Sequence, residues 1–259
     1  MYRGSLSYRV FARLRHRIHQ WLVSGATRVE CYARLRPAIR TCLIRNGTQL
    51  VIEGFPRSGN TYASIAFDVA NPDDVPRVTH LHSPVNLEIA VRRGIPAVVL
   101  LRDPLDSVTS FIQRSPALSA SALLREYSRF YKRAARLVDD LIVAPFEAVT
   151  DDFGSILRAV NLRFGTNFIP YEPTPENEDR VRGGIEWSDS FNSRRHANRE
   201  MTVSRPSIER DLGKSAIREA IAADCAGELA NARAVYLSVL RASTIGTLRR
   251  SRMTPDLEM

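Results

Sequence analysis

Short apolar runs alternate with longer helical periods through the middle of the chain. Four of the runs predict buried strands, at 50–55, 77–82, 97–101 and 141–144. Apolar residues recur at helical spacing at 62–70, 105–113, 118–138, 153–164 and 208–240. Strands that alternate with helices form parallel sheets with helices on their faces. The pattern predicts one α/β domain at 48–245, with a central parallel sheet flanked by helices, and a polar tail at 246–259.

The first 47 residues differ and predict a basic amphipathic helical extension. Its first helix has an apolar stripe made of Val10, Phe11, Leu14, Ile18, Trp21 and Leu22. A second basic helical stretch follows, with the stripe Tyr32, Leu35, Ile39 and Leu43. Of the chain's 37 basic and 28 acidic side chains, residues 1–48 hold ten arginines and one acid, which leaves 27 of each sign. The net charge of +9 therefore belongs to the extension.

This charge distribution indicates which classes of partner to expect. Because the body is neutral and lacks interleaved aromatics in a known module, we expect no nucleic-acid partner. The basic extension is expected to lie on an anionic membrane, or on a lipid-linked acceptor, with its apolar stripe buried. The alternative is a helix packed on the core with a charged face in solvent.

The cysteines and the longest apolar runs bear on the compartment. The three cysteines have neither the even count of a disulfide framework nor the spacing of metal ligands. No apolar run approaches the roughly 20 residues that cross a bilayer, and the start lacks the apolar core of a secretion signal. We expect a cytoplasmic protein, soluble or peripheral on the cytoplasmic membrane face, and no metal site.

A glycine-containing loop follows the first predicted strand. It reads Gly54-Phe55-Pro56-Arg57-Ser58-Gly59-Asn60-Thr61 and leads into a predicted helix. This nearly matches the phosphate-binding pattern G-x-x-x-x-G-K-S/T, in which backbone N–H groups and a helix N-terminus hold an anion. Asn60 stands where a kinase or ATPase of that type has the lysine that reaches the β- and γ-phosphates. This difference argues against transfer of a γ-phosphoryl group.

The loop resembles another family more closely. Residues 56–62 are similar to the P-K-S-G-T-T-W segment of sulfotransferases that use 3′-phosphoadenosine 5′-phosphosulfate (PAPS), which grips the 5′-phosphosulfate. The resemblance implies a P-loop NTPase-like sulfotransferase fold, no metal, and adenosine 3′,5′-bisphosphate (PAP) as product. It assigns donor binding to Arg57, Ser58, Gly59, Asn60, Thr61 and Tyr62. Arg57 replaces a lysine found in many members, so its catalytic role should be electrostatic. An ordinary strand-to-helix turn is the alternative.

A second segment, at 102–111, follows the strand predicted at 97–101. It resembles the family's R-N-P-x-D-x-x-x-S-Y, whose arginine and serine bind the 3′-phosphate, and it places Arg102 and Ser110 in those positions. A planar cation and a hydroxyl suit that phosphate, which ATP lacks. Alone, the segment also fits a helix start, with Asp103 as cap and Pro104 in the first turn. Two ordered motifs at strand ends favour a ligand site.

Two histidines lie between these motifs. Residues 77–84 align without gaps on the family's R-I-V-K-T-H-L-P, which makes His82 the general base and puts His80 in place of a lysine. Counting back from Arg102 favours His80 instead. We prefer His82. Residues two apart on a strand face the same side, so both imidazoles can reach one site.

Residues 180–191 resemble the family's late R-K-G-x-x-G-D-W-x-x-x-F loop, which folds over the donor. Arg180 or Arg182 would then contact the 3′-phosphate, although the glycines are displaced. A surface loop anchored by one tryptophan is the alternative.

Taken together, the motifs predict a sulfotransferase that moves a sulfuryl group from PAPS to a hydroxyl of a carbohydrate, glycolipid or small metabolite. In-line displacement would be assisted by a histidine base. The alternatives are a nucleotide-dependent kinase and a non-catalytic nucleotide-binding or membrane-associated protein.

Overall fold

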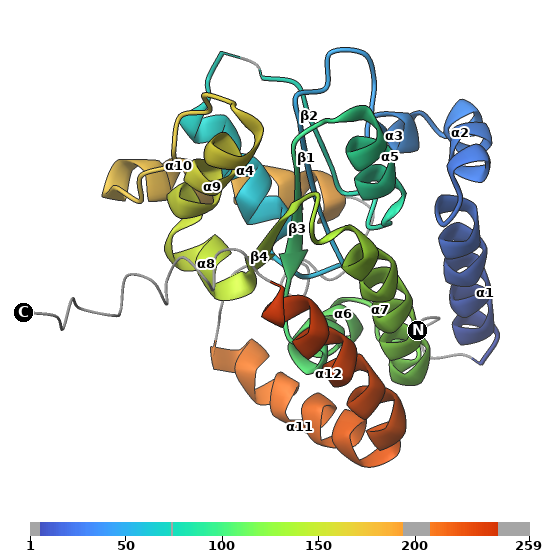
Figure 1. The fold of residues 1–259 in the computed structure, drawn as a ribbon. Coiled ribbons are helices and arrows are strands. Elements are labelled where there is room, and N and C mark those ends of the chain that lie inside the picture. Colours follow the sequence, from blue (N-terminus) through green and yellow to red (C-terminus); the bar gives the residue numbers. More distant parts are fainter. Residues whose placement is uncertain (1–5, 74, 194–207, 243–259) are drawn as a thin grey trace, which may run out of the picture.

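The computed structural model describes residues 6–73, 75–193 and 208–242, and four parallel strands form its central sheet (Figure 1). They are β1 (Leu50–Gly54), β2 (Arg77–Thr79), β3 (Ala97–Leu101) and β4 (Ile142–Pro145). Their spatial order is β2-β1-β3-β4, and the register pairs Val51 with Val78 and Ile52 with Val98. The strand β2 lies on one side of β1, and the chain then crosses to the other side of β1 to form β3. The strand order therefore reverses between β1 and β3.

Helices cover both faces of this sheet, as predicted, in a single α/β domain (Figure 1). In chain order the helices of the body are α4 (Asn60–Ala70), α5 (Val85–Arg93), α6 (Pro104–Arg114), α7 (Ala120–Ala134), α8 (Phe146–Asp151), α9 (Phe153–Phe164), α10 (Pro175–Ser193), α11 (Ile208–Asp224) and α12 (Ala226–Arg241). The strands β1 and β3 are buried along their whole length. Buried strands with helices on both faces need apolar residues at successive positions, which explains their continuous apolar runs.

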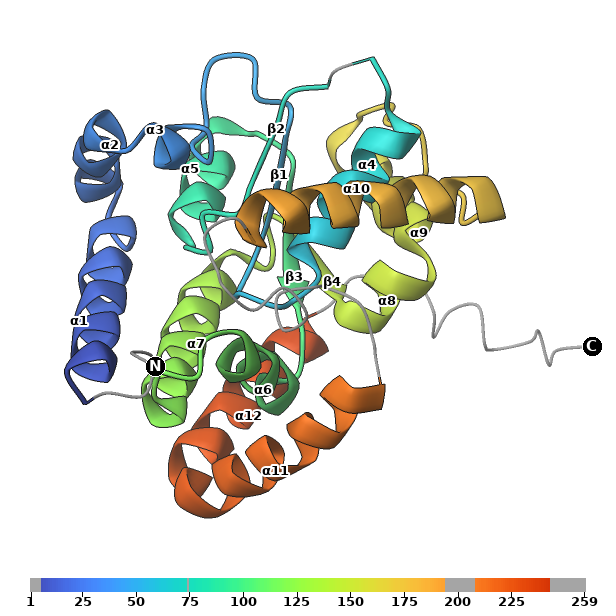
Figure 2. The ribbon, with the colours of Figure 1, turned by 180° about the vertical axis from the view of Figure 1, so that it is seen from behind.

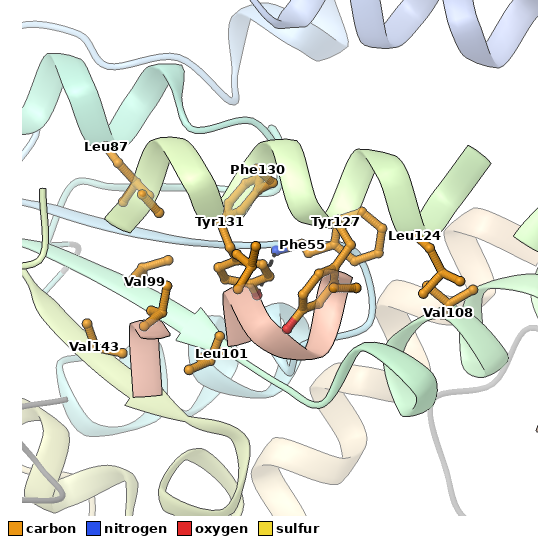
Figure 3. Close-up of a cluster of buried hydrophobic side chains, with 14 of the residues drawn as sticks. Phe55, Leu87, Val99, Leu101, Val108, Leu124, Tyr127, Phe130, Tyr131 and Val143 are labelled. Carbon is orange, nitrogen blue, oxygen red and sulfur yellow. Dashed lines mark hydrogen bonds between the residues drawn. The ribbon is translucent and has the colours of Figure 1, made fainter. Parts of the chain in front are cut away.

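Alternation along each strand divides the interior into two cores. Val51, Val99 and Val143 face a core shared with α5, α6, α7 and α12, whereas the residues next to them face a core shared with α4, α8, α9 and α10. Figure 3 shows the first core, where the aromatic side chains of α7 stand beside β3 and Phe55. Among them, Tyr127 and Tyr131 are fully buried.

Several boundaries differ from the predictions. The strand predicted at 77–82 ends at Thr79, because His80 and His82 have left-handed backbone conformations, with φ of 66° and 55°. The helical region 208–240 is two helices with a break at Cys225. The short helices α5 and α8 were not predicted. The helix predicted at 118–138 comprises α7 and a 3-10 turn at 135–137.

The segment 180–191, expected to be a loop, is part of α10, so that prediction is wrong. Figure 2 shows α10 lying across α4. The approach is close at Gly184, where an added Cβ would lie 2.8 Å from Cγ2 of Ile65. Gly184, which the sequence resemblance placed in a loop over the donor, therefore allows α10 to cross α4 closely.

The N-terminal extension forms α1 (Leu6–Val23), α2 (Ala26–Leu35) and the short α3 (Pro37–Arg40), which pack against the body. Nε2 of His16 lies 2.8 Å from a carboxylate oxygen of Glu126 on α7, and the Ser83 hydroxyl donates to the Val23 carbonyl at 2.6 Å. The helix α1 thus packs on the core through its polar side, and its apolar stripe faces the other way. None of the described helices is long and apolar enough to cross a membrane.

Candidate functional site

A cavity of about 970 Å³ opens at the carboxyl ends of β1 and β3. Ligands of open α/β sheets bind where the strand order reverses, and this is that place. The loop after β1, the turn after β2 and Arg102 after β3 line the cavity, together with parts of α1, α6 and α10. The predicted motifs of the three strands therefore meet around one space.

The loop after β1 has the shape of an anion cradle. Gly59 precedes α4 with φ of 94°, a left-handed conformation that glycine adopts without steric cost. A Cβ there would lie 3.3 Å from Cγ1 of Val149, so the loop has no space for a side chain. Residues 59–62 line the cavity where α4 begins. The first N–H groups of a helix have no partner within it, so they are available to an anion.

Asn60 closes this loop on itself. Its side-chain nitrogen donates to the carbonyl of Phe55 at 3.3 Å, and the residue is almost fully buried. The lysine of a kinase-type loop would extend toward the phosphates from this position. Asn60 instead donates its side-chain amide to the loop's own backbone.

Tyr131 on α7 supports the loop from behind. Its hydroxyl donates to the Leu100 carbonyl at 2.6 Å and accepts from the Phe55 backbone N–H at 3.4 Å, the dashed contact in Figure 3. The Ser58 hydroxyl lies 3.3 Å from the same oxygen and is fully buried. The Ser58 side chain therefore points away from the cavity, and only its backbone remains available to a ligand. Sequence analysis did not identify Tyr131, which reaches the loop from 73 residues along the chain.

Arg102 and the loop are in direct contact. The Arg102 guanidinium donates through Nη1 to the Arg57 carbonyl at 2.8 Å, and it stacks on the Phe146 ring at 3.9 Å from the centroid. Its Nε is buried and has no hydrogen-bond partner among the described residues. Burial lowers the pKa of Arg102, against nearby carboxylates such as Asp106 that raise it. A partly desolvated guanidinium with an unused donor is suited to an anion.

Arg57 joins the two motifs through its side chain. Its Nε donates to the Ser110 hydroxyl at 2.9 Å. Ser110 is nearly buried on α6, behind Arg57. The same segment also begins α6, where the Asp103 carboxylate accepts from the backbone N–H groups of Leu105 and Asp106. The segment therefore begins a helix and also brings the Arg102 cation to the cavity.

His82 is oriented as a base. Its Nδ1 lies 3.0 Å from the Gly54 carbonyl oxygen, and because a carbonyl only accepts, Nδ1 carries the proton. Nε2 is then left with its lone pair. Burial lowers the pKa of His82 to about 4, although the Gly54 contact raises it. A neutral imidazole with a free nitrogen can accept a proton at neutral pH.

His80 lies beside it in a different arrangement. Its Nε2 is 3.2 Å from the Thr61 hydroxyl oxygen, and the two imidazole centroids are 5.6 Å apart. Burial lowers the pKa of His80 to about 3. Because its Nε2 is occupied by Thr61, His80 is better placed to hold the start of α4 than to receive a proton. This geometry favours His82 between the two candidates.

Glu53 fixes the turn that carries both histidines. This fully buried carboxyl on β1 accepts the backbone N–H groups of Leu81 at 3.1 Å and His82 at 3.0 Å, and the Asn86 amide at 3.0 Å. Burial raises the pKa of Glu53 to about 8, although these donors lower it. Sequence analysis passed over this residue, yet a glutamate inside the apolar run 50–54 was a visible signal.

The remaining predicted residues are less central. The Tyr62 hydroxyl donates to Glu178 at 2.9 Å and so helps to anchor α10, while its ring lines the cavity. Arg182 also lines the cavity and pairs with Asp179 at 3.1 Å. Arg180 is exposed and does not line the cavity.

The helix α1 contributes residues that sequence analysis did not connect with the site. His16, His19 and Gln20 line the same cavity as His80 and His82. Four of the chain's five histidines therefore gather here, and the fifth, His196, lies outside the described residues. Their approach depends on the packing of α1 on α7, which no local pattern predicts.

Within the described part of the chain, no group of three or more His, Cys, Asp or Glu side chains is arranged to hold a metal ion. Comparisons with protein-family models, with curated proteins and with solved structures found no match to this chain.

Proposed function

We propose that the protein is a PAPS-dependent sulfotransferase with a P-loop NTPase-like sulfotransferase fold, which transfers a sulfuryl group to a hydroxyl acceptor. The observation that carries the proposal is the meeting of two anion-binding segments at one cavity. Arg102 donates to the Arg57 carbonyl at 2.8 Å, and the Arg57 side chain donates to Ser110 at 2.9 Å. A donor with phosphate groups at both the 5′ and 3′ positions requires two such segments side by side.

The residues present fit this donor. Gly59 leaves the backbone of the loop open to an anion, and the buried Nε of Arg102 lacks a partner within the described chain. The loop N–H groups, Thr61 and Arg57 would hold the 5′-phosphosulfate and Arg102 the 3′-phosphate, while Ser110, which does not line the cavity, would keep Arg57 in position. We assign Arg182 a supporting contact, because it lines the cavity on α10 whereas Arg180 does not.

The donor would supply an activated sulfuryl group: as the acceptor oxygen bonds to sulfur, the bond from sulfur to the 5′-phosphate oxygen breaks and PAP leaves. Nε2 of His82 takes the proton of the acceptor hydroxyl, and its Nδ1–H stays hydrogen-bonded to the Gly54 carbonyl. Arg57 and the N-terminus of α4 stabilise the charge that develops on the departing phosphate. Glu53 keeps His82 in place through its backbone.

The shape of the acceptor side follows from the other walls of the cavity. Phe111 and Arg114 of α6 and the polar face of α1 also line it. The acceptor therefore meets both an aromatic surface and several hydrogen-bonding side chains. These features suit a carbohydrate, a glycolipid head group or a small hydroxylated metabolite.

The proposal is tested by sulfuryl transfer from ³⁵S-labelled PAPS to a panel of such acceptors, and by release of PAP. We expect transfer with the native chain and a loss of about 10²-fold or more in kcat for His82→Gln, with PAP affinity kept. The matched variant His80→Gln should retain more activity than His82→Gln. Transfer of phosphate from ATP, without transfer from PAPS, would favour a kinase. Binding of PAP with neither reaction on any acceptor would favour a non-catalytic protein.

A further inference from the structure

The helix α1 presents its apolar stripe to solvent. Six large apolar side chains on it are between 50 and 80% exposed: Leu6, Val10, Phe11, Leu14, Ile18 and Trp21. The side that contacts the body carries His16, His19 and the fully buried Val23. Helical spacing puts these two sets on opposite sides of the helix. The helix is thus amphipathic, but its apolar side faces solvent and its polar side faces the body of the protein.

The stripe forms one continuous surface. Single exposed apolar residues are ordinary, but a contiguous apolar strip marks an interaction surface. Figures 1 and 2 both show α1 along one edge of the molecule, with α7 on its inner side. On α2, Leu35 is also 80% exposed. The six side chains of the stripe on α1 are each at least half exposed in the described structure.

Arginines border the stripe. By helical spacing Arg15 lies at one margin and Arg17 at the other, and both are exposed, as is Arg9. No acidic residue occurs before Glu30. An isologous contact between two copies of this face would bring arginines together, which opposes self-association. A partner with an apolar interior beneath a negatively charged surface complements both the apolar stripe and the arginines beside it.

We propose that the outer face of α1 binds an anionic lipid bilayer, with the helix lying in the plane of the interface. The apolar stripe enters the boundary of the acyl chains, while Arg15 and Arg17 contact anionic head groups. The inner face of the same helix lines the cavity through His16, His19 and Gln20. Binding therefore holds the mouth of the cavity beside the membrane surface. This inference does not depend on the reaction proposed above.

The experiment uses the full chain with Trp187→Phe, which leaves Trp21 as the only indole. Vesicles of phosphatidylcholine mixed with phosphatidylserine should shift the Trp21 emission to shorter wavelength and sediment the protein. Vesicles of phosphatidylcholine alone should bind at least about tenfold more weakly, and added salt should weaken binding to the anionic vesicles.

Variants distinguish the face from general adhesion. Leu14→Glu with Ile18→Glu should lower vesicle binding by about tenfold or more. The control Leu162→Glu, on a still more exposed leucine of α9, should bind as the native chain does. Arg15→Gln with Arg17→Gln should weaken binding more than Arg92→Gln with Arg93→Gln, two exposed arginines of α5. All four proteins should keep their melting temperature and PAP affinity, because the changed side chains are exposed and outside the cavity wall.

Three results would overturn the proposal. The first is the absence of binding to anionic vesicles, or binding that Leu14→Glu with Ile18→Glu leaves unchanged. The second is a dimer, measured by light scattering, that the same substitutions dissociate without any effect of lipid. The third is a Trp21 emission already typical of a buried indole in the lipid-free monomer.

Discussion

Nε of Arg57 lies 2.9 Å from the hydroxyl oxygen of Ser110, across 53 residues of sequence. This contact joins the loop after β1 to the helix after β3, and the Arg102 guanidinium completes the connection through the Arg57 carbonyl. Arg57 and Arg102 therefore form one cationic corner of the cavity, with Ser110 buried behind Arg57. Its parts come from two neighbouring strands, so the corner exists only when the sheet is assembled.

Substitution of Arg57 tests its electrostatic role. Arg57→Ala removes the cation and should lower kcat by about 10²-fold or more, whereas Arg57→Lys keeps a charge near the departing phosphate and should retain part of the activity. Steady-state rates with PAPS and one acceptor measure both. Full and equal activity of the two variants would remove Arg57 from the mechanism.

Gly59→Ala tests the cradle after β1. The added Cβ would meet Val149 at 3.3 Å, and φ of 94° is unfavourable for alanine. We expect a loss of stability of about 1–2 kcal/mol and a loss of PAP affinity of at least about tenfold.

Gly47→Ala is the matched control. Its φ is 87°, and an added Cβ there meets nothing within 4 Å. This variant should carry a similar backbone strain but bind PAP like the native chain. If Gly47→Ala lowered PAP affinity as much as Gly59→Ala, the effect would come from instability and not from the cradle.

The lowered pKa of His82 predicts that the reaction rate falls only at unusually low pH. Burial lowers the pKa of His82 to about 4, so the imidazole stays neutral through the weakly acidic range. The acid limb of kcat/KM, which reports groups of the free enzyme, should therefore fall near pH 4 and well below the ordinary histidine value. A limb at pH 6.5 or above would mean that His82 is solvated in solution or is not the base.

Glu53 gives a stability prediction with a definite sign. Burial raises its pKa in the fold from the ordinary 4.5 to about 8, so the folded state binds the proton more tightly than the unfolded state. Its contribution is complete below about pH 4.5 and is lost progressively as pH rises from there through 8, with a total on the order of 5 kcal/mol. Glu53→Gln should therefore remove most of the fall in melting temperature between pH 6.5 and 8.5.

Glu53 also acts on the reaction by positioning His82. Glu53→Gln should lower kcat more than it raises KM for the donor, because it disturbs the turn at 80–82 and not the loop after β1. An unchanged kcat in a folded variant would show that the backbone contacts of Leu81 and His82 hold the turn without this carboxyl.

Much of the architecture could be predicted from local patterns. The four strands, the glycine-containing loop after β1 and the cation after β3 are each encoded within a few residues, and their order along the chain specifies a parallel sheet. Glycine at 59 and Asp103 at a helix start are chemical signals of the same local kind. The convergence of these segments follows because the carboxyl ends of parallel strands share one edge.

The rest depended on contacts between distant segments. The backbone of His80 and His82 leaves the strand because Glu53 binds the N–H groups of the turn, and a strand pattern alone cannot reveal that contact. Segment 180–191 became a helix because Tyr62 and Tyr171 anchor Glu178 and because Gly184 fits against Ile65. The polar face of α1 lines the cavity for a similar reason, because His16 contacts the carboxylate of Glu126 on α7.

The central claim is that two adjacent segments hold a nucleotide by a 5′ and a 3′ anion, and calorimetric titration tests it most directly. We predict that the native chain binds PAP at least about tenfold more tightly than 5′-AMP or ATP, and that Arg102→Ala removes this preference while leaving 5′-AMP binding nearly unchanged. Tighter binding of ATP than of PAP, or a PAP preference that survives Arg102→Ala, would contradict it.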